Sequence, residues 1–210
     1  MKYLELLNTF KNSYVFTIQD IKNIFKKINY VQIHSWIKEG KIIRLAGGKF
    51  ILPDKINPNM NTDLMLVANE LKNSYISLES ALSYYQIIPE AVFKITSITT
   101  ERPEVINNNT GIYVYHRISP LLFNNYTLID SMVPERKIKI ASKEKALFDF
   151  VYLKSVKLND FKDIEKFRFN TAGNILDIIS LTKYSDKVKS TVKKHNINLL
   201  IRYMQNAQSE

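Results

Sequence analysis

The chain has 210 residues, of which 45% are hydrophobic and 24% charged, and it contains no cysteine. This composition is typical of a globular protein, and the lack of cysteine excludes disulfide frameworks, thiolate zinc sites and cysteine nucleophiles. No stretch is apolar enough to cross a membrane and the N-terminus does not resemble a secretory signal, so we expect a cytoplasmic protein without a membrane partner.

The positive charge is concentrated near the N-terminus. The whole chain has 30 basic and 20 acidic residues, a net charge of +10. Residues 1–55 contain ten basic and four acidic residues, a net charge of +6, and the other 155 residues contribute +4. A local excess of this kind attracts polyanions, of which nucleic acid is the commonest. A solvated basic surface without any partner is the alternative interpretation.

Three short helices are predicted in the first 40 residues. Apolar residues at helical spacing indicate helices over 1–11, 18–25 and 30–39. Thr17 and Asp20 form a capping box at the start of the second helix, and Gly40 is suited to the left-handed position after the third. The residues expected to face the core are Tyr3, Leu4, Leu7 and Phe10, then Ile21, Ile24 and Phe25, then Val31, Ile33, Trp36 and Ile37.

A hairpin is predicted directly after the helices. Apolar strands over 41–45 and 49–52 flank a turn that contains Gly47 and Gly48. Three helices followed by a two-stranded wing are typical of a winged helix-turn-helix domain. Winged domains bind DNA in many proteins and dock other proteins in some, so the pattern alone leaves both functions open.

The third helix is the predicted DNA-reading element, because the second helix of a helix-turn-helix lies in the major groove. Gln pairs with adenine through two hydrogen bonds, and basic side chains near the helix and on the wing are suited to phosphates. A Lys pair in a turn and a lone surface His are also ordinary features without DNA. The candidate DNA-binding residues are Lys26, Lys27, Asn29, Tyr30, Gln32, His34, Ser35, Arg44 and Lys49.

A change in composition marks a domain boundary. The segment from residue 53 to 62 contains two prolines and three asparagines and shows no periodicity. We therefore predict a winged domain over 1–53, a linker over 54–62 and a mixed α/β domain over 63–210. The expected fold class is α+β.

The C-terminal domain is predicted to mix helices and strands. Ser77 and Ser142 are the expected N-caps of two helices, and the turn over 107–111 is expected to join the first two strands. The last helix is basic and amphipathic, and His195 and Asn196 interrupt its apolar stripe, so it is either shorter or broken there. We predict helices over 63–72, 78–88, 142–153, 172–181 and 186–203, and strands over 92–100, 111–118 and 136–140.

No catalytic constellation is found in the sequence. The three histidines, His34, His116 and His195, are far apart, and no glycine-rich phosphate-binding motif occurs. A nucleotidyltransferase site needs two carboxylates one residue apart on a strand after a glycine turn, and only Asp54 follows here. The acidic residues over 160–165 are interleaved with Lys and Arg, as on a solvated surface. We expect no enzyme, no cofactor and no metal.

Residues 75–153 carry several blocks that together are fairly specific. Tyr-Ile-Ser-Leu-Glu-Ser-Ala-Leu-Ser-Tyr-Tyr spans 75–85, Ile-Pro-Glu spans 88–90, Thr-Ser-Ile-Thr-Thr spans 96–100, and Ile-Ala-Ser-Lys-Glu-Lys-Ala-Leu-Phe-Asp spans 140–149. With the winged-helix pattern before them, these blocks resemble the AbiEi family of antitoxins. Ser77, Glu79, Ser142, Lys143, Glu144 and Asp149 match the family pattern, and helix capping or packing explains them.

This resemblance implies a bacterial antitoxin from an abortive-infection toxin–antitoxin pair. The N-terminal domain would repress its own operon at an operator with an inverted repeat, and the C-terminal domain would counter a nucleotidyltransferase toxin, directly or functionally. An interaction module that sequesters a toxin without specific DNA binding is the alternative. An enzyme that acts on nucleic acid agrees with the charge, but the sequence offers no residues for its chemistry.

Overall fold

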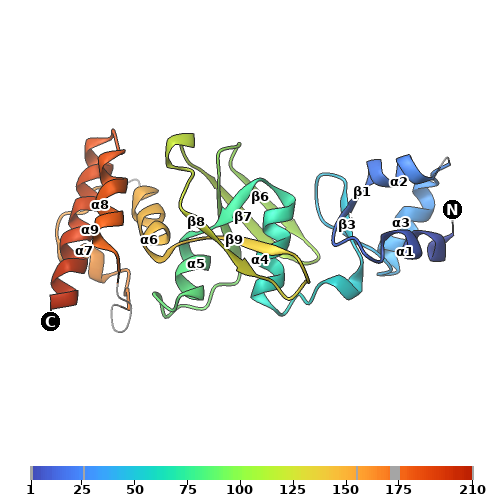
Figure 1. Ribbon diagram of the computed structural model, residues 1–210, viewed down its shortest axis with the longest axis horizontal. Coiled ribbons are helices and arrows are strands. Elements are labelled where there is room, and N and C mark those ends of the chain that lie inside the picture. Colours follow the sequence, from blue (N-terminus) through green and yellow to red (C-terminus); the bar gives the residue numbers. More distant parts are fainter. Residues whose placement is uncertain (1, 26, 155, 171–175, 210) are drawn as a thin grey trace.

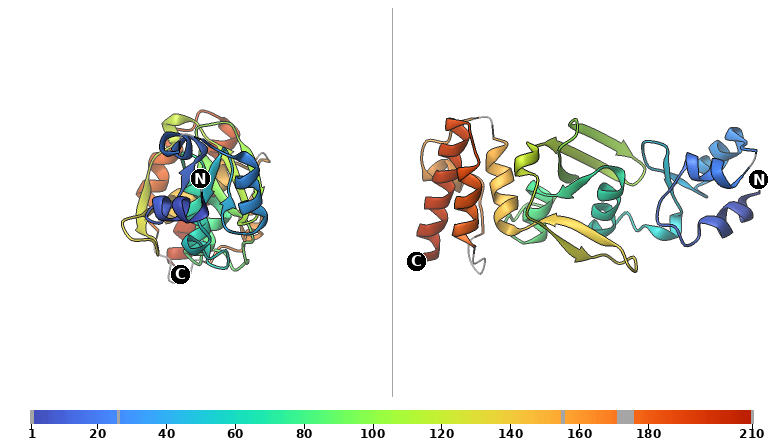
Figure 2. Two further views of the ribbon diagram at one scale, coloured as in Figure 1. Left: turned by 90° about the vertical axis from the view of Figure 1, so that its right-hand side faces the viewer. Right: turned by 45° about the horizontal axis from the view of Figure 1, so that its top comes forward.

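The computed structural model describes residues 2–25, 27–154, 156–170 and 176–209 (Figure 1). The chain is mixed α+β and elongated, with three parts arranged along its long axis in sequence order (Figures 1 and 2). Short helices and a small sheet form the N-terminal end, a larger sheet with helices forms the middle, and helices form the C-terminal end. None of the helices in the described part of the chain combines the length and the apolar character that a membrane span requires.

The N-terminal part contains the three expected helices and one strand that was not predicted. The extra strand β1 has only two residues, and it pairs antiparallel with β3 so that the small sheet has the order β1-β3-β2. A two-residue strand shows no alternation, which explains why the sequence pattern does not reveal it. The elements are α1 (Tyr3–Phe10), β1 (Phe16–Thr17), α2 (Ile18–Ile24), α3 (Tyr30–Lys38), β2 (Ile43–Arg44) and β3 (Lys49–Ile51).

Local signals for the ends of these helices are confirmed. The Thr17 hydroxyl accepts a hydrogen bond from the Asp20 amide, and the Asp20 carboxylate accepts one from the Thr17 amide. Gly40 follows α3 with a φ of +68°, in the left-handed region that glycine adopts without strain. These contacts join residues close in the sequence, so short motifs predict them well.

The N-terminal part has a hydrophobic cluster of its own, in which the Phe10 and Phe16 rings stack. Three residues expected in it are exposed instead: Leu4, Ile24 and Val31. In α1 the buried stripe contains Leu6 in place of Leu4, and after α2 the half-buried Phe25 packs against the cluster. The buried members of this cluster are Leu6, Phe10, Phe16, Ile21, Ile33, Trp36, Ile42, Phe50 and Leu52.

The middle part is built on a six-stranded sheet with the order β6-β7-β5-β4-β9-β8. Helix α4 and the short α5 pack against this sheet (Figure 1). The predicted helix over 78–88 ends at Tyr84, before Pro89. The elements are η1 (Pro53–Lys55), α4 (Asn61–Leu71), β4 (Ser74–Ile76), α5 (Leu78–Tyr84), β5 (Ile95–Thr99), β6 (Glu104–Asn108), β7 (Gly111–Arg117), η2 (Pro120–Leu122), β8 (Tyr126–Asp130) and β9 (Lys137–Ala141).

Three strands of this sheet, β4, β6 and β8, were not predicted. Strand β4 is only three residues long and fully buried, whereas β6 and β8 are edge strands with largely exposed side chains. The turn over 107–111 connects β6 with β7, and β7 pairs parallel with β5. The expected direct turn between the strands over 92–100 and 111–118 is therefore wrong, because a hidden edge strand lies between them.

The C-terminal part consists of helices. The predicted helix over 172–181 lies partly at 172–175, outside the described residues, and the helix in this region starts at Ile178. The predicted helix over 186–203 corresponds to α9, which begins later, at Thr191, because residue 186 is the last residue of α8. Asn196 does not interrupt α9, because its buried side chain accepts a hydrogen bond from the Leu158 amide and donates one to the Val156 carbonyl. Helix α6 (Lys143–Tyr152) packs against α5 and β9 and is counted with the middle part, and the C-terminal part contains α7 (Phe161–Glu165), α8 (Ile178–Asp186) and α9 (Thr191–Ser209).

The segment predicted as a linker is mostly exposed but is anchored at one residue. Residues 54–62 include most of η1 and the first two residues of α4, and Ile56 is buried within the larger hydrophobic cluster of the molecule. Leu45 and Ile51 of the N-terminal part also belong to that cluster. The N-terminal part therefore has its own core and also contacts the middle part through apolar side chains.

Candidate nucleic-acid interface

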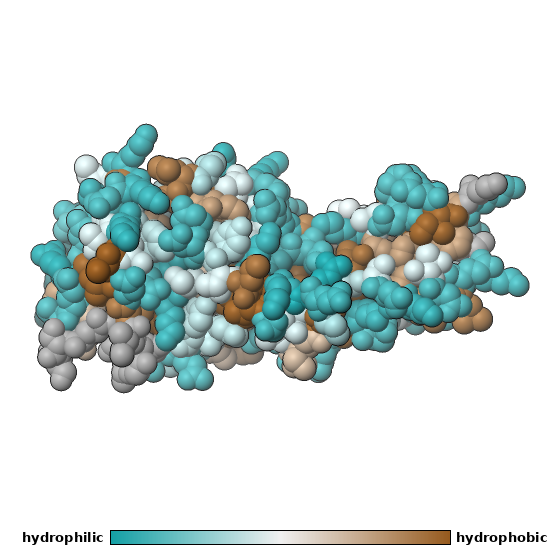
Figure 3. Space-filling model, viewed as in Figure 1, coloured by the Kyte–Doolittle hydropathy of each residue, from teal (hydrophilic) through white to brown (hydrophobic). Residues whose placement is uncertain are grey.

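Helix α3 presents a polar and basic stripe to solvent. Its inner side is formed by Ile33 and Trp36, which are buried in the N-terminal cluster. At 3.6 residues per turn, the opposite side carries Val31, His34, Ser35 and Lys38, and all four are exposed. In Figure 3 the N-terminal end of the molecule is hydrophilic along its edges and shows hydrophobic residues across its middle.

The start of α3 is fixed by Asn29. Its side-chain oxygen accepts a hydrogen bond from the Gln32 amide at 3.3 Å, which is an N-cap contact. Tyr30 follows with 52% of its side chain exposed. Gln32 lies at the flank of the outward stripe and is half-buried. Of the residues chosen for base contacts, His34 and Ser35 thus lie on the outward stripe itself.

The basic residues chosen for phosphate contacts fall into three groups. Lys26 lies outside the described residues. Lys27 and Arg44 are exposed, one before α3 and the other on β2. Lys49 is half-buried, and its ammonium donates hydrogen bonds to the carbonyl oxygens of Glu70 and Leu71 at the end of α4.

We therefore withdraw Lys49 from the candidate DNA contacts. A helix end carries unpaired carbonyl groups and a partial negative charge, and a Lys ammonium satisfies both. Its partners are 21 and 22 residues further along the chain. A reading of the hairpin alone therefore cannot reveal that this lysine is already bound.

The N-terminal part is held against the middle part at two more points, one on the hairpin and one just before β1. The Leu45 carbonyl accepts a hydrogen bond from the Asn108 side chain at 3.2 Å, next to the β6–β7 turn. The Tyr14 hydroxyl lies 3.5 Å from the Asp63 carbonyl at the start of α4. Together with Lys49, these contacts hold the hairpin next to the middle part, while α1, α2 and α3 lie further toward the N-terminal end of the molecule (Figure 1).

The C-terminal end of α3 contains a small charge cluster. Glu39 forms an ion pair with Lys41 at 2.6 Å and accepts a hydrogen bond from the Ser35 hydroxyl. These hydrogen bonds, first from Lys41 and then from Ser35, hold the pKa of the exposed Glu39 carboxyl below its usual value. Ser35 is thus engaged by a carboxylate, which makes its position less favourable for a phosphate than that of Lys38.

Sequence reasoning missed two residues of the outward stripe. Lys38 lies four residues after His34, and that spacing alone predicts a shared face. The apolar character of Val31 predicts a core position, although its spacing from Ile33 and Trp36 places it on the other side of the helix. In both cases the position of the residue in the helical period predicts which side of the helix it occupies better than the residue type does.

A second polar constellation lies inside the middle part. Lys145 and Asp149 of α6 form a fully buried ion pair, and the same carboxylate accepts hydrogen bonds from the hydroxyls of Ser77 at 2.8 Å and Tyr75 at 3.0 Å. Ser77 was predicted to cap α5, but its hydroxyl binds Asp149 and makes no cap contact. Ser142, by contrast, caps α6 as expected by accepting a hydrogen bond from the Lys145 amide.

Burial controls the protonation of this pair. Removal from water raises the pKa of Asp149, and the neighbouring Lys145 ammonium and the two hydroxyls act in the opposite direction. The same burial lowers the pKa of Lys145. Because the Lys145 and Asp149 side chains are fully buried, the cluster has no access for a substrate, and we interpret it as a structural element.

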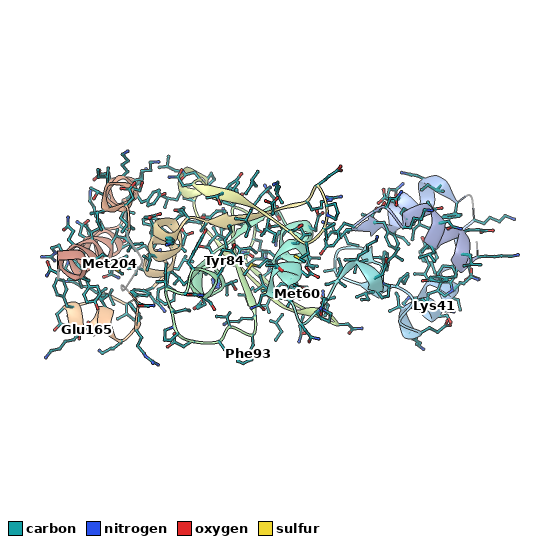
Figure 4. The ribbon with its side chains drawn as sticks, turned by 60° about the horizontal axis from the view of Figure 1, so that its bottom comes forward. Lys41, Met60, Tyr84, Phe93, Glu165 and Met204 are labelled. Atoms are coloured by element: carbon teal, nitrogen blue, oxygen red, sulfur yellow. The ribbon has the colours of Figure 1, made fainter. Side chains whose placement is uncertain are left out.

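An apolar cavity opens on the middle part. It has a volume of about 530 Å³ and is lined mainly by Ile88, the segment from Glu90 to Lys94, Ile112 of β7, Phe150 and Phe167, with Glu79 and Lys166 also in the lining. Phe93 lies at its rim with 91% of its side chain exposed and points away from the protein (Figure 4). DNA offers little apolar surface to such a cavity, so it does not belong to the candidate interface on α3.

Within the described residues, no three His, Asp or Glu side chains lie close enough together to hold a metal ion. Comparisons with known proteins add no further assignment: no family model matches the chain, and no curated protein matches it.

Proposed function

We propose that residues 1–53 are a winged helix-turn-helix domain that binds duplex DNA with α3 in the major groove. The observation that carries the proposal is the outward stripe of α3, where His34, Ser35 and Lys38 project opposite to buried Ile33 and Trp36. A helix that enters the groove needs polar side chains on one side and a core on the other. The net charge of +6 over residues 1–55 supports the same partner.

The proposed contacts divide into positioning and recognition. Lys27, Lys38 and Arg44 neutralise phosphates and fix the position of the domain, while Gln32 and His34 approach base edges. Asn29 acts on the helix by capping it. The hairpin contributes through the exposed Arg44, because the end of the hairpin that contains Lys49 is bound to the middle part.

The biological role is proposed from the sequence resemblance. Residues 75–153 resemble AbiEi antitoxins, so we propose that the protein represses its own operon and counters a nucleotidyltransferase toxin. Repression would follow from occupation of an inverted repeat near the promoter. The part of the chain after the winged domain would carry the antitoxin activity.

The test is a fluorescence-anisotropy titration of the full chain against the DNA upstream of its gene and a scrambled duplex of equal length, at two salt concentrations. We expect tighter binding to the upstream DNA at both concentrations. Equal affinity for the two duplexes would contradict specific recognition, and no binding to either would contradict the DNA-binding proposal altogether.

A matched pair of lysine variants locates the interface. Lys27→Ala removes one phosphate contact, so the slope of log affinity against log salt should fall by about 0.9. Lys162→Ala removes an exposed lysine from α7 at the opposite end of the molecule and should leave the slope unchanged. An equal effect of the two variants would show that the protein binds DNA through diffuse charge.

One observation favours a second candidate function, an interaction module that sequesters a toxin. The cavity beside Phe93 is apolar and exposed, and such features are typical of surfaces that bind other proteins. Under this alternative, co-expression with the neighbouring toxin gene would restore growth even for a protein that fails to prefer its upstream DNA. Under the leading proposal, the protein both prefers its upstream DNA and restores growth.

A further inference from the structure

Val31 is an apolar residue at the centre of the outward stripe of α3. It is the second residue of the helix, it is 78% exposed, and it lies on the same side as Lys38 and opposite to Ile33 and Trp36. Tyr30, the residue before it, is also exposed. The first turn of α3 therefore presents two adjacent large side chains to solvent.

The local structure does not explain a valine at this position. A β-branched side chain loses rotamer freedom in a helix, so valine is a poor choice for an exposed helical site. The N-cap contact from Asn29 to the Gln32 amide does not involve the Val31 side chain. Val31 also contributes nothing to the N-terminal cluster, which is formed from the other side of the helix.

The major groove offers one apolar group on its base edges, the C5 methyl group of thymine. Side chains near the N-terminus of a recognition helix are the ones that contact base edges. We propose that Val31 contacts thymine methyl groups and thereby helps to determine the preferred DNA sequence. This inference rests on the proposed function and names a recognition residue and the base feature that it recognises.

The surroundings of Val31 favour DNA over a protein or a membrane as the partner. Lys27, His34 and Lys38 are exposed near it on the same helix or just before it, and carboxylates of this helix lie only at its far end, at Glu39. An apolar contact framed by basic residues suits a duplex, where a methyl group lies between rows of phosphates.

The experiment replaces thymine by deoxyuridine at one position of the upstream DNA at a time. This change removes the methyl group and keeps the base pair and the O4 acceptor. For the unmodified protein we expect a loss of affinity of about fourfold at one or two positions, which corresponds to about 0.8 kcal/mol. Affinity is measured by anisotropy at constant salt, because the methyl contact carries no charge.

Two variants make the assignment specific. Val31→Ala should bind the thymine duplex about fourfold more weakly and show no further loss with deoxyuridine, since the two changes remove the same contact. Leu4→Ala removes another largely exposed apolar side chain, from α1, where Leu4 is 67% exposed, and should keep the deoxyuridine effect. Circular dichroism of both variants checks that they fold.

The possible results separate this inference from the proposed function. If the protein prefers its upstream DNA but tolerates deoxyuridine at every position, the role of Val31 is refuted and operator binding stands. If Val31→Ala retains the deoxyuridine effect, another residue makes the contact and the inference is again refuted. If the protein shows no preference for its upstream DNA, both proposals fall together.

Discussion

The N-terminal and middle parts use charged residues in opposite ways. In the N-terminal part the core is entirely apolar, and charged side chains such as Lys27, Lys38 and Arg44 are exposed. In the middle part the core contains a fully buried ion pair, Lys145 with Asp149, whose carboxylate also binds two hydroxyls. The same residue types thus serve as a contact surface in one part and as an internal structural element in the other.

This difference teaches how function can be sought in such a chain. A buried ion pair has lost its hydration and is held by geometry, so it is costly to disturb but not available to a partner. An exposed lysine contributes little to stability and remains free to bind a polyanion. Burial therefore separates the residues that maintain the fold from those that are candidates for recognition.

The substitution expected to have the largest effect on stability is Asp149→Ala, in the buried ion pair. The change leaves the Lys145 ammonium buried without its partner, so the free energy of unfolding should fall by about 3–5 kcal/mol. Urea denaturation followed by circular dichroism measures the loss. The matched control is Asp130→Ala, which breaks the exposed ion pair with Lys137 and should cost less than about 1 kcal/mol. Similar losses for the two variants would contradict the structural role of the buried cluster.

A second prediction concerns the contact that joins the two parts. Lys49→Met keeps the side-chain stem but removes the ammonium from the end of α4, and the loss of charged hydrogen bonds should cost about 1.5–3 kcal/mol. Trp36 is the only tryptophan of the chain and lies in the N-terminal cluster, so its fluorescence reports on that part alone.

The two parts should unfold together in the unmodified protein, with coincident transitions by fluorescence and by circular dichroism. In Lys49→Met the fluorescence transition should move to lower urea concentration than the circular dichroism transition. If the two transitions still coincide after the substitution, the hairpin contact does not couple the parts and the apolar residues around Ile56 do so.

The contrast between the parts also explains what the sequence predicts well. The capping contacts of Thr17 and Ser142 join residues three positions apart, so a short motif contains all the information. The outward stripe of α3 follows from the helical period, and the wrong placement of Val31 came from weighing its apolar character above that period. The exposed side of α3 is therefore readable from local patterns, whereas contact of its residues with DNA stays a prediction.

Features that depend on distant partners were not predictable in this way. Ser77 binds a carboxylate 72 residues away, and Lys49 binds carbonyl groups 21 and 22 residues away. Strand β4 is too short to show alternation, and its identity as a strand comes from its neighbours β5 and β9. In each case, the interaction that determines the role of the residue or strand forms only when the chain folds. A short stretch of sequence therefore does not reveal it.

The smallest expected effect is a pH dependence of stability from His116 of β7. Burial, with a smaller contribution from Lys94, lowers the pKa of its imidazole below the ordinary value of 6.5, and Glu79 acts in the opposite direction. In the unfolded chain the imidazole binds a proton more readily, so the free energy of unfolding should decrease as the pH falls below 6.5.

The substitution His116→Gln should make the free energy of unfolding less dependent on pH. The effect should appear between the ordinary histidine pKa and roughly pH 5, where carboxylates begin to titrate. Urea denaturation at several pH values measures it, and His34→Gln, which changes an exposed histidine of α3, is the matched control and should leave the slope unchanged. If both variants flatten the profile equally, burial in the middle part is not the cause. His116 is half-buried and has no ion-pair partner among the described residues. A selective effect of His116→Gln would therefore show that burial in the middle part controls the charge of a single residue as well as that of an ion pair.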